Sequence, residues 1–287
     1  MRKHTMGLLA LAAASTLIFS ACGSAEVGGE PEGGTTEGGG GEGSGDGITI
    51  GIKYDQPGLG LQDGAEFTGF DVDVARYVAN ELGYTEDQIT FKETPSANRE
   101  AMLQNGDVDM IFATYSITDD RKEVIDFAGP YFIAGQDLLV AADNTDITGP
   151  EDLEGKNLCS VTGSTSAEKI KTDYAEGVQL LERPGYAECV TALSAGQVDA
   201  VTTDDIILAG LAAANGDGNL KVVGAPFSEE QYGVGLPKDS DQCEAINEAI
   251  TKMIDDGAWE EAVATNTEGA DYTPNADLNP PTPADCA

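Results

Sequence analysis

The chain has 287 residues, enough for two ordinary lobes that each bury a core of their own. Its 51 acidic residues far exceed its 15 lysines and arginines, so the formal net charge is −36 at pH 7. A chain this acidic repels phosphate backbones and anionic lipid, which excludes nucleic-acid binding and electrostatic adsorption to membranes.

The single histidine, His4, lies in an N-terminal segment that we expect to be removed. The exported chain then has no imidazole, which excludes Ser-His-Asp and Cys-His catalysis and every histidine-ligated zinc site. Carboxylates, lysines, tyrosines and cysteines remain as acid–base candidates. We expect no cofactor and no metal.

Residues 1–21 have the pattern of a signal peptide, with a basic start and an apolar run over residues 7–19 that is too short to span a bilayer. The small residues before Cys22 resemble the lipobox of bacterial lipoproteins, in which that cysteine becomes the lipidated N-terminus. Phe19 departs from the leucine that is usual in this motif. A plain secretory signal is the alternative.

Residues 22–47 are expected to form a tether. Residues 23–47 include twelve glycines and six acidic residues. They contain too few apolar side chains to form a folded core. A flexible coil of this length spans about 28 Å. With Cys22 lipidated, the tether would hold a folded domain at the extracellular face of the cell membrane.

Four cysteines remain in the exported chain, and an even number predicts two disulfides with three possible pairings. We favour Cys159 with Cys189, inside one lobe, and Cys243 with Cys286. The second bond would attach the proline-rich tail over residues 267–287 to the body. Metal binding is the alternative, but the sequence has no C-x-x-C pair.

Strand and helix patterns alternate from Ile48 onward. Three short apolar runs are typical of strands, at residues 48–52, 89–91 and 108–113. Two amphipathic segments are typical of helices, at residues 71–82 and 97–105. The order βαβαβ predicts a parallel sheet covered by helices.

A short pattern, L-x-x-G-x-V-D, occurs at residues 103–109 and again at residues 193–199. Each copy has the features of a helix end, a glycine stop and the start of a strand, the second of which runs over residues 198–203. The repeat predicts two lobes of similar build, although chance similarity of such joints is the alternative. Two α/β lobes place their loops at a shared cleft, where small ligands often bind.

Several motifs in order resemble the amino-acid-binding solute-binding proteins of ABC importers, extracellular solute-binding protein family 3. They are G-F-D-V-D at residues 69–73, S-I-T-D-D-R at 116–121, D-F and Y-F within 126–132, and D-L-E-G-K at 152–156. The resemblance covers residues 48–266. Two further segments are most similar to glutamate-binding lipoproteins of actinobacteria: residues 51–58 and 159–166.

The resemblance implies an α/β, two-lobed fold of the type II periplasmic-binding-protein kind, each lobe a mostly parallel sheet flanked by helices. Lobe 1 would comprise residues 48–138 and 236–266, and lobe 2 residues 142–232. Two crossing strands, at about residues 137–142 and 231–237, would form the hinge.

The resemblance also implies a function. The chain would be a monomer that captures a free L-amino acid by hinge closure and delivers it to an ABC permease with its ATPase subunit. Glutamate is the favoured ligand, and aspartate, glutamine and asparagine are the others considered. A dehydratase of the same fold acting on a prephenate-like acid, or a ligand sensor, is the alternative, but capture requires no enzyme activity.

A buried site for an amino acid must meet its carboxylate and its ammonium with opposite charge or hydrogen bonds. By the family motifs, Arg121 forks onto the α-carboxylate, a geometry that suits a planar guanidinium. Ser116 and the backbone near Thr114 complete this cradle on lobe 1. Thr165 and Ser166, in a turn that opens a helix, add donors from lobe 2.

The remaining predicted ligand residues meet the ammonium and the ligand's side chain. Asp204 matches the family carboxylate that pairs with the ammonium, and the adjacent Asp205 is its rival. Arg99 ends an S-A-N-R run that resembles aspartate- and glutamate-binding members, in which this arginine holds the distal carboxylate. Lys53 supplies a second cation, and Tyr54 would pack on the ligand's methylene groups. Two extra cations favour an acidic amino acid.

Overall fold

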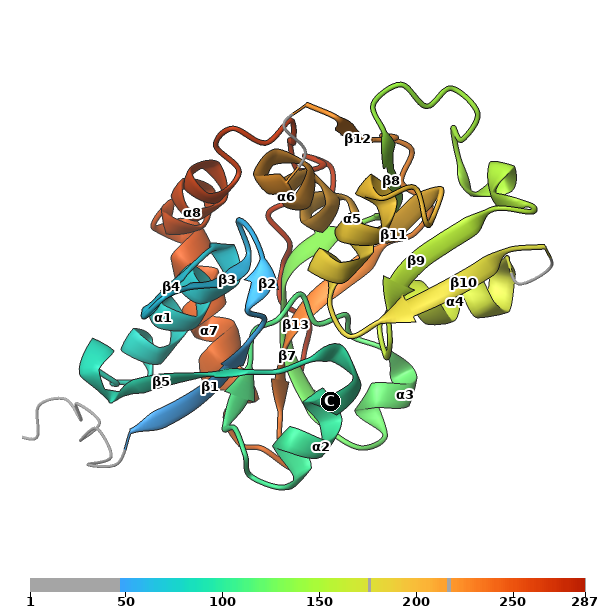
Figure 1. Ribbon diagram of the computed structural model, residues 1–287. Helices are drawn as coiled ribbons and strands as arrows, with labels where there is room; N and C mark the ends of the chain where they lie inside the picture. Colours follow the sequence, from blue (N-terminus) through green and yellow to red (C-terminus); the bar gives the residue numbers. More distant parts are fainter. Residues whose placement is uncertain (1–46, 175–176, 216–217, 287) are drawn as a thin grey trace, which may run out of the picture. The chain divides into compact units, whose positions relative to one another are not determined.

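A computed structural model describes residues 47–174, 177–215 and 218–286. The expected signal peptide, Cys22 and residues 22–46 of the expected tether lie outside the described residues. Two five-stranded sheets and one small three-stranded sheet make up the strand content of the described part (Figure 1). Helices cover both of the large sheets, so the fold belongs to the α/β class.

The first sheet has the strand order β5-β1-β6-β13-β7. Strands β1, β5 and β6 are parallel, whereas β13 is antiparallel to both of its neighbours. Buried Ile50 of β1 lies opposite Phe91 and Met110, so apolar residues meet across the centre of the sheet. The bounds are β1 Ile48–Ile52, β5 Ile89–Glu93, β6 Met110–Ile111, β7 Asp126–Ala134 and β13 Glu230–Leu236.

Of the two helices predicted for the first sheet, one has the predicted form and the other does not. The helix predicted over residues 71–82 is α1, which buries Val74 and Val78 one turn apart against the sheet. The helix predicted over residues 97–105 is divided into a 3-10 turn and a short α-helix, because the amide of Asn98 bonds the carbonyl of Pro95. The bounds are α1 Phe70–Glu81, η1 Glu86–Gln88, η2 Ser96–Asn98, α2 Arg99–Gln104, α3 Asp119–Lys122, α7 Cys243–Asp255 and α8 Ala258–Asn266.

The second sheet has the order β10-β9-β11-β8-β12. Strands β9, β10 and β11 are parallel, and β8 is antiparallel to β11 and β12. Its build therefore matches that of the first sheet. The bounds are β8 Gln136–Ala141, η3 Pro150–Leu153, β9 Asn157–Val161, α4 Thr165–Asp173, β10 Gln179–Arg183, α5 Tyr186–Ser194, β11 Ala200–Asp204, α6 Asp205–Asn215 and β12 Leu220–Val222.

The repeated L-x-x-G-x-V-D pattern occupies equivalent places in the two large sheets. The glycine of each copy has a positive φ, 69° and 67°, and stops the preceding helix. The final aspartate of each copy accepts a hydrogen bond from a backbone amide of the neighbouring strand, Asp109 from Thr49 at 2.7 Å and Asp199 from Asn157 at 2.8 Å. The expected similarity of the two halves is thus confirmed.

The chain passes from the first sheet to the second at Gly135, between β7 and β8, and returns between β12 and β13. The change of sheet thus lies a few residues before each expected lobe boundary. The reason is that β13 pairs with β7 along most of its length, so Glu230 already belongs to the first sheet. The third sheet, β2 Asp55–Gln56, β3 Gly60–Asp63 and β4 Glu66–Thr68, is an antiparallel meander after β1.

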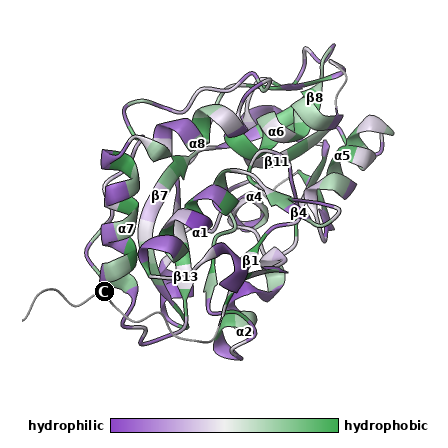
Figure 2. Ribbon diagram, turned by 90° about the vertical axis from the view of Figure 1, so that its left-hand side faces the viewer, coloured by the Kyte–Doolittle hydropathy of each residue, from purple (hydrophilic) through white to green (hydrophobic). Residues whose placement is uncertain are grey.

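The C-terminal tail covers the open edge of β7. The side chain of Asn279 exchanges two hydrogen bonds with the backbone of Ile133, at 2.9 and 2.8 Å. A disulfide between Cys243 and Cys286 then attaches the tail to α7, whose hydrophobic residues alternate with hydrophilic ones along the helix (Figure 2). The second expected disulfide, Cys159–Cys189, joins β9 to α5. Within the described part of the chain, no helix combines the length and apolar character needed to cross a membrane.

Candidate functional site

One cavity is lined by side chains that follow the strands of both large sheets. It lies at the carboxyl ends of β6, β9 and β11, where ligands of open α/β sheets bind. All of its lining side chains carry a polar group except Ile207. They are Gln56, Ser96, Arg99, Thr114, Ser116, Ser164, Thr165, Ser166, Tyr186, Thr203, Asp204 and Ile207.

The structure brings together six of the nine ligand residues predicted from the sequence. These six line the cavity: Arg99, Thr114, Ser116, Thr165, Ser166 and Asp204. The other three, Arg121, Lys53 and Tyr54, are not part of its lining. Residues more than one hundred positions apart in the chain therefore meet at one place.

Arg99 is a buried cation, only 3% exposed, that has no counter-ion in the described part of the chain. Its Nη1 donates to the carbonyl of Ala113 at 2.7 Å, and its guanidinium lies 4.2 Å from the centre of the Tyr115 ring. Its Nε has no hydrogen-bond partner among the described residues. Burial, and then the charge of Arg121, lower the pKa of Arg99. A buried, unpaired cation is costly, so this geometry favours an anionic ligand.

Asp204 is the corresponding unpaired anion, at the end of β11. Its Oδ2 accepts a hydrogen bond from the Tyr232 hydroxyl at 2.6 Å, whereas Oδ1 has no partner among the described residues. Burial raises the pKa of Asp204 well above its ordinary value, and Glu230 raises it further. The rival Asp205 faces elsewhere, since its Oδ1 accepts from the amide of Ile206 at 2.7 Å and it lines a different cavity.

Thr114 adopts a backbone conformation that is uncommon for a side chain of its kind, with a φ of 46°. Its amide donates to Oδ2 of Asp71 at 2.9 Å, and Oδ1 of the same carboxylate accepts from the hydroxyl of Tyr131 at 2.7 Å. Burial raises the pKa of Asp71 to about 6. The aspartate of the G-F-D-V-D motif therefore acts from α1 to hold Thr114 at the cavity.

The first turn of α4 supplies the opposite wall. Ser164 caps this helix, because its Oγ accepts from the amide of Ala167 at 3.0 Å. Oγ1 of Thr165 lies 3.3 Å from Oγ of Ser116, so the segments that follow β9 and β6 meet across the cavity. The amino end of a helix attracts a carboxylate through its free amides and its dipole.

Arg121 lies beside the cavity and joins the two sheets. Its Nη1 donates to the carbonyl of Ser116 at 2.7 Å and its Nη2 to that of Gly163 at 3.2 Å, while Nε donates to Glu100 at 3.1 Å. A guanidinium has five N–H donors, so two remain after these three bonds. Arg121 thus keeps two N–H donors for a ligand, while its charge is paired with Glu100.

Lys53 and Tyr54 have partners of their own. Lys53 is 4% exposed and forms an ion pair with Asp55 at 3.5 Å. The ring of Tyr54 packs against Phe67, with 5.3 Å between centroids, and its hydroxyl donates to the carbonyl of Phe91 at 3.1 Å. The described structure therefore places Tyr54 in a small aromatic cluster next to β5.

Sequence reasoning missed several residues of the cavity wall. Ser96 lies in the S-A-N-R run and Ser164 in the quoted segment over residues 159–166, so membership of these motifs could have found them. Gln56 lies in the quoted segment over residues 51–58 but was given no role there, and no pattern in the sequence indicated Tyr186 or Thr203. The hydroxyl of Tyr186 accepts from that of Thr203 at 2.7 Å, and burial raises the pKa of Tyr186 to about 12.

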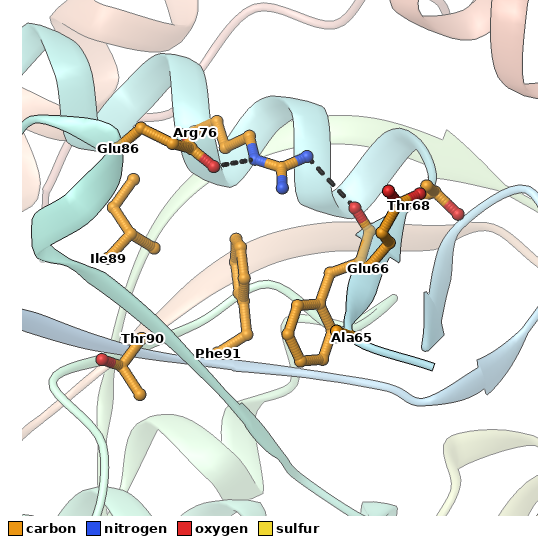
Figure 3. Close-up of a pocket in the computed structure, with 9 residues that line it drawn as sticks. Ala65, Glu66, Thr68, Arg76, Glu86, Ile89, Thr90 and Phe91 are labelled. Carbon is orange, nitrogen blue, oxygen red and sulfur yellow. Dashed lines mark hydrogen bonds and ion pairs between the residues drawn. The ribbon is translucent and has the colours of Figure 1, made fainter. Parts of the chain in front are cut away.

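A second hollow lies between β4, α1 and β5, but its arginine is already neutralised (Figure 3). Nε of Arg76 is 2.9 Å from Glu86, and Nη1 donates to the carbonyl of Phe67 at 3.2 Å. The Arg76 side chain is 34% exposed, so water also solvates its charge. The cavity between the two sheets, with its unpaired buried charges, is therefore the candidate ligand site. Among the described residues, no cluster of histidine, cysteine, aspartate and glutamate is placed to hold a metal ion.

Residues 48–267 match the model of a protein family, the bacterial extracellular solute-binding proteins, family 3. This chain belongs to that family. A glutamate-binding protein, GluB, from Corynebacterium efficiens is 48% identical over 231 residues, which cover 76% of this chain and 78% of that relative. The ABC transporter glutamine-binding protein GlnH from Bacillus subtilis is 38% identical over 264 residues, or 90% of this chain and 95% of the relative.

Solved structures of similar proteins show the same two-lobed architecture. An ancestral arginine-binding protein bound to glutamine is 34% identical, with a TM-score of 0.70 over 76% of this chain and 96% of that structure. The GluR0 ligand-binding core from Nostoc punctiforme, in complex with L-glutamate, is 28% identical with a TM-score of 0.67, over 76% and 98% of the two chains. Members of family 3 are extracellular solute-binding proteins, and the predicted family and fold are confirmed.

Proposed function

We propose that this family 3 protein captures an acidic amino acid, glutamate above all, for an ABC importer. One observation carries the proposal: Arg99 of α2 and Asp204 of β11, buried side chains of opposite charge, line one cavity, and each has a polar atom without a partner among the described residues. An acidic amino acid carries an ammonium that complements Asp204 and a side-chain carboxylate that complements Arg99. The name of the glutamate-binding relative supports this ligand, and that of the glutamine-binding relative supports an amino acid with a side chain of the same length.

The charge balance of the site supports an acidic side chain on the ligand. In our assignment Arg121 and the first turn of α4 bind the α-carboxylate, and Asp204 binds the ammonium. Arg99 is then left as a buried cation with no counter-ion in the described structure. A second carboxylate on the ligand would neutralise it, whereas an amide would not. This ranks glutamate and aspartate above glutamine and asparagine.

Capture would proceed by closure of the two sheets around the ligand. The ligand docks first on Arg121, Ser116 and Arg99 of the first sheet, and Thr165, Ser166 and Asp204 then close over it. The contacts between Ser116 and Thr165, and between Arg121 and Gly163, belong to the closed arrangement. A lipidated Cys22 would keep this monomer at the extracellular face of the membrane, where it delivers its ligand to the permease.

Calorimetry with each of the twenty common amino acids tests the proposal. We expect glutamate or aspartate to bind most tightly, with no change in the ligand after release. A ligand present at 100 times its Kd should also stabilise the fold by about 2.7 kcal/mol. Absence of binding by every amino acid, or turnover of prephenate, would overturn it.

A further inference from the structure

A carboxylate of the small third sheet reaches across to a helix of the second large sheet. Asp55 lies on β2, which follows β1 of the first sheet, and its Oδ2 accepts a hydrogen bond from the amide of Tyr186 at 2.9 Å. Tyr186 is the first residue of α5. The bond therefore joins parts of the chain 131 positions apart, and β2 also contacts α6 of the second sheet.

Helix α5 lacks a side-chain cap of its own. Its N-cap residue is Gly185, so no side chain accepts from the first amides of the helix. A Cβ at this position would lie 2.5 Å from Oδ2 of Asp55 and 2.8 Å from Oε2 of Glu188, so a larger residue would make the Asp55 carboxylate shift from its present place. Asp55 is therefore a cap supplied from outside the helix, where a negative charge is favourable.

Lys53 holds the cap in place. Its Nζ lies 3.5 Å from Oδ1 of Asp55, the carboxylate oxygen that does not bond to α5. Burial lowers the pKa of Lys53, and the attraction of Asp55 opposes this effect. Lys53 had been assigned to the ligand, but its nearest anion in the described structure is this carboxylate.

The cap acts on the cavity because α5 begins with a residue of the cavity wall. Tyr186 lines the cavity, and its hydroxyl accepts from Thr203, the neighbour of Asp204. We propose that Asp55 is a positioning residue that latches the closed state: it caps α5 only when the two sheets are together, and so slows ligand release. The inference rests on the proposed function, because it concerns the same cavity.

Removal of the latch should appear in the dissociation rate of the ligand. Asp55→Ala should increase koff for glutamate by about fivefold to tenfold, the usual effect of losing a helix cap, and change kon by less than about twofold. Stopped-flow tryptophan fluorescence or surface plasmon resonance measures both rates. Asp63→Ala removes an exposed acid of the same small sheet and is the matched control, expected to leave both rates unchanged.

Two further variants separate a latch from a general loss of structure. Asp55→Asn keeps an acceptor oxygen for the amide of Tyr186 and should restore most of the slow release. Gly185→Ala places a methyl group where the carboxylate approaches, and should raise koff without removing any charge. Both changes break the same bond, that between Asp55 and the amide of Tyr186. The double variant Asp55→Ala with Gly185→Ala should therefore release glutamate about as fast as the stronger single variant.

A last variant tests whether Lys53 serves the latch or the ligand. Lys53→Gln should raise koff for glutamate and glutamine by the same factor if it serves the latch. Three results would each overturn the latch. The first is a rise in koff for glutamate but not for glutamine in Lys53→Gln, and the second is an unchanged koff in Asp55→Ala. The third is a double variant whose koff rises by the product of the two single effects. Parent protein that binds no amino acid would instead refute the proposed function, so the two failures are distinguishable.

Discussion

Replacement of Arg99 by methionine should separate stability from ligand affinity. Methionine retains an apolar, unbranched side chain beside Tyr115 but removes the one buried cation that lacks a counter-ion in the described structure. The ligand-free protein and the complex should respond in different directions, because the charge is costly in the first and neutralised in the second.

The size of each effect follows from the contacts of Arg99. Loss of the bond to Ala113 costs about 1.5–3 kcal/mol, and loss of the contact over Tyr115 about 0.5–2 kcal/mol. Relief of the desolvation of a buried ion is of similar size, several kcal/mol. We therefore expect the free energy of unfolding without ligand to stay within about 1 kcal/mol of the parent's.

Binding should instead fall steeply. A ligand carboxylate that is buried without its partner costs about 2–5 kcal/mol, a loss of about 30-fold to several thousandfold in Kd. Calorimetry of Arg99→Met with glutamate and with glutamine measures the loss, and we expect glutamate to lose more. Arg76→Met, which removes a half-buried arginine paired with Glu86, is the control and should bind as the parent does. Equal losses for glutamate and glutamine would refute the assignment of Arg99 to the distal carboxylate.

Three further changes test the site and the fold. Asp204→Asn should raise the Kd of every amino acid by at least about 30-fold in calorimetry, because all amino acids share the ammonium group. Asp205→Asn should leave these Kd values unchanged. Asp71 keeps its proton to about pH 6 when folded but only to its ordinary pKa of 3.8 when unfolded. Asp71 should therefore contribute a fall of about 3 kcal/mol in urea stability as pH rises through this window, and Asp71→Asn should remove that contribution while those of Asp204 and Asp205 remain. Cys243→Ser with Cys286→Ser should lower the free energy of unfolding by about 2–4 kcal/mol and leave affinity unchanged.

Much of the fold could be predicted because its signals are local. The apolar spacing over Val74 and Val78 placed α1 within one residue at each end. The repeated pattern that ends in Asp109 and Asp199 indicated two equivalent halves, since a helix end, a glycine stop and a strand start are all set by neighbouring residues. The division of the second helix into two pieces was missed, because it depends on the bond between Asn98 and Pro95.

Part of the cavity wall could not be predicted from local sequence patterns. Residues that the family motifs gave a role, such as Ser116 and Ser166, were found, but Gln56 and Tyr186, to which no role was given, were not. Gln56 lies on a two-residue strand and Tyr186 at a helix start with an ordinary sequence, so neither position stands out in the chain. Both line the cavity only because β2 packs against α5.

The sequence by itself determined the alternation of strands and helices, the two similar halves and the strongly acidic composition. Only the tertiary structure decided which charges have partners. Lys53 and Arg99 are both cations close to the first sheet, yet Lys53 meets Asp55 while Arg99 meets no carboxylate of the described chain. Pairing depends on distance and burial in three dimensions, because a charge removed from water needs a partner within a few ångströms. The candidate site is the place where that partner must come from the ligand.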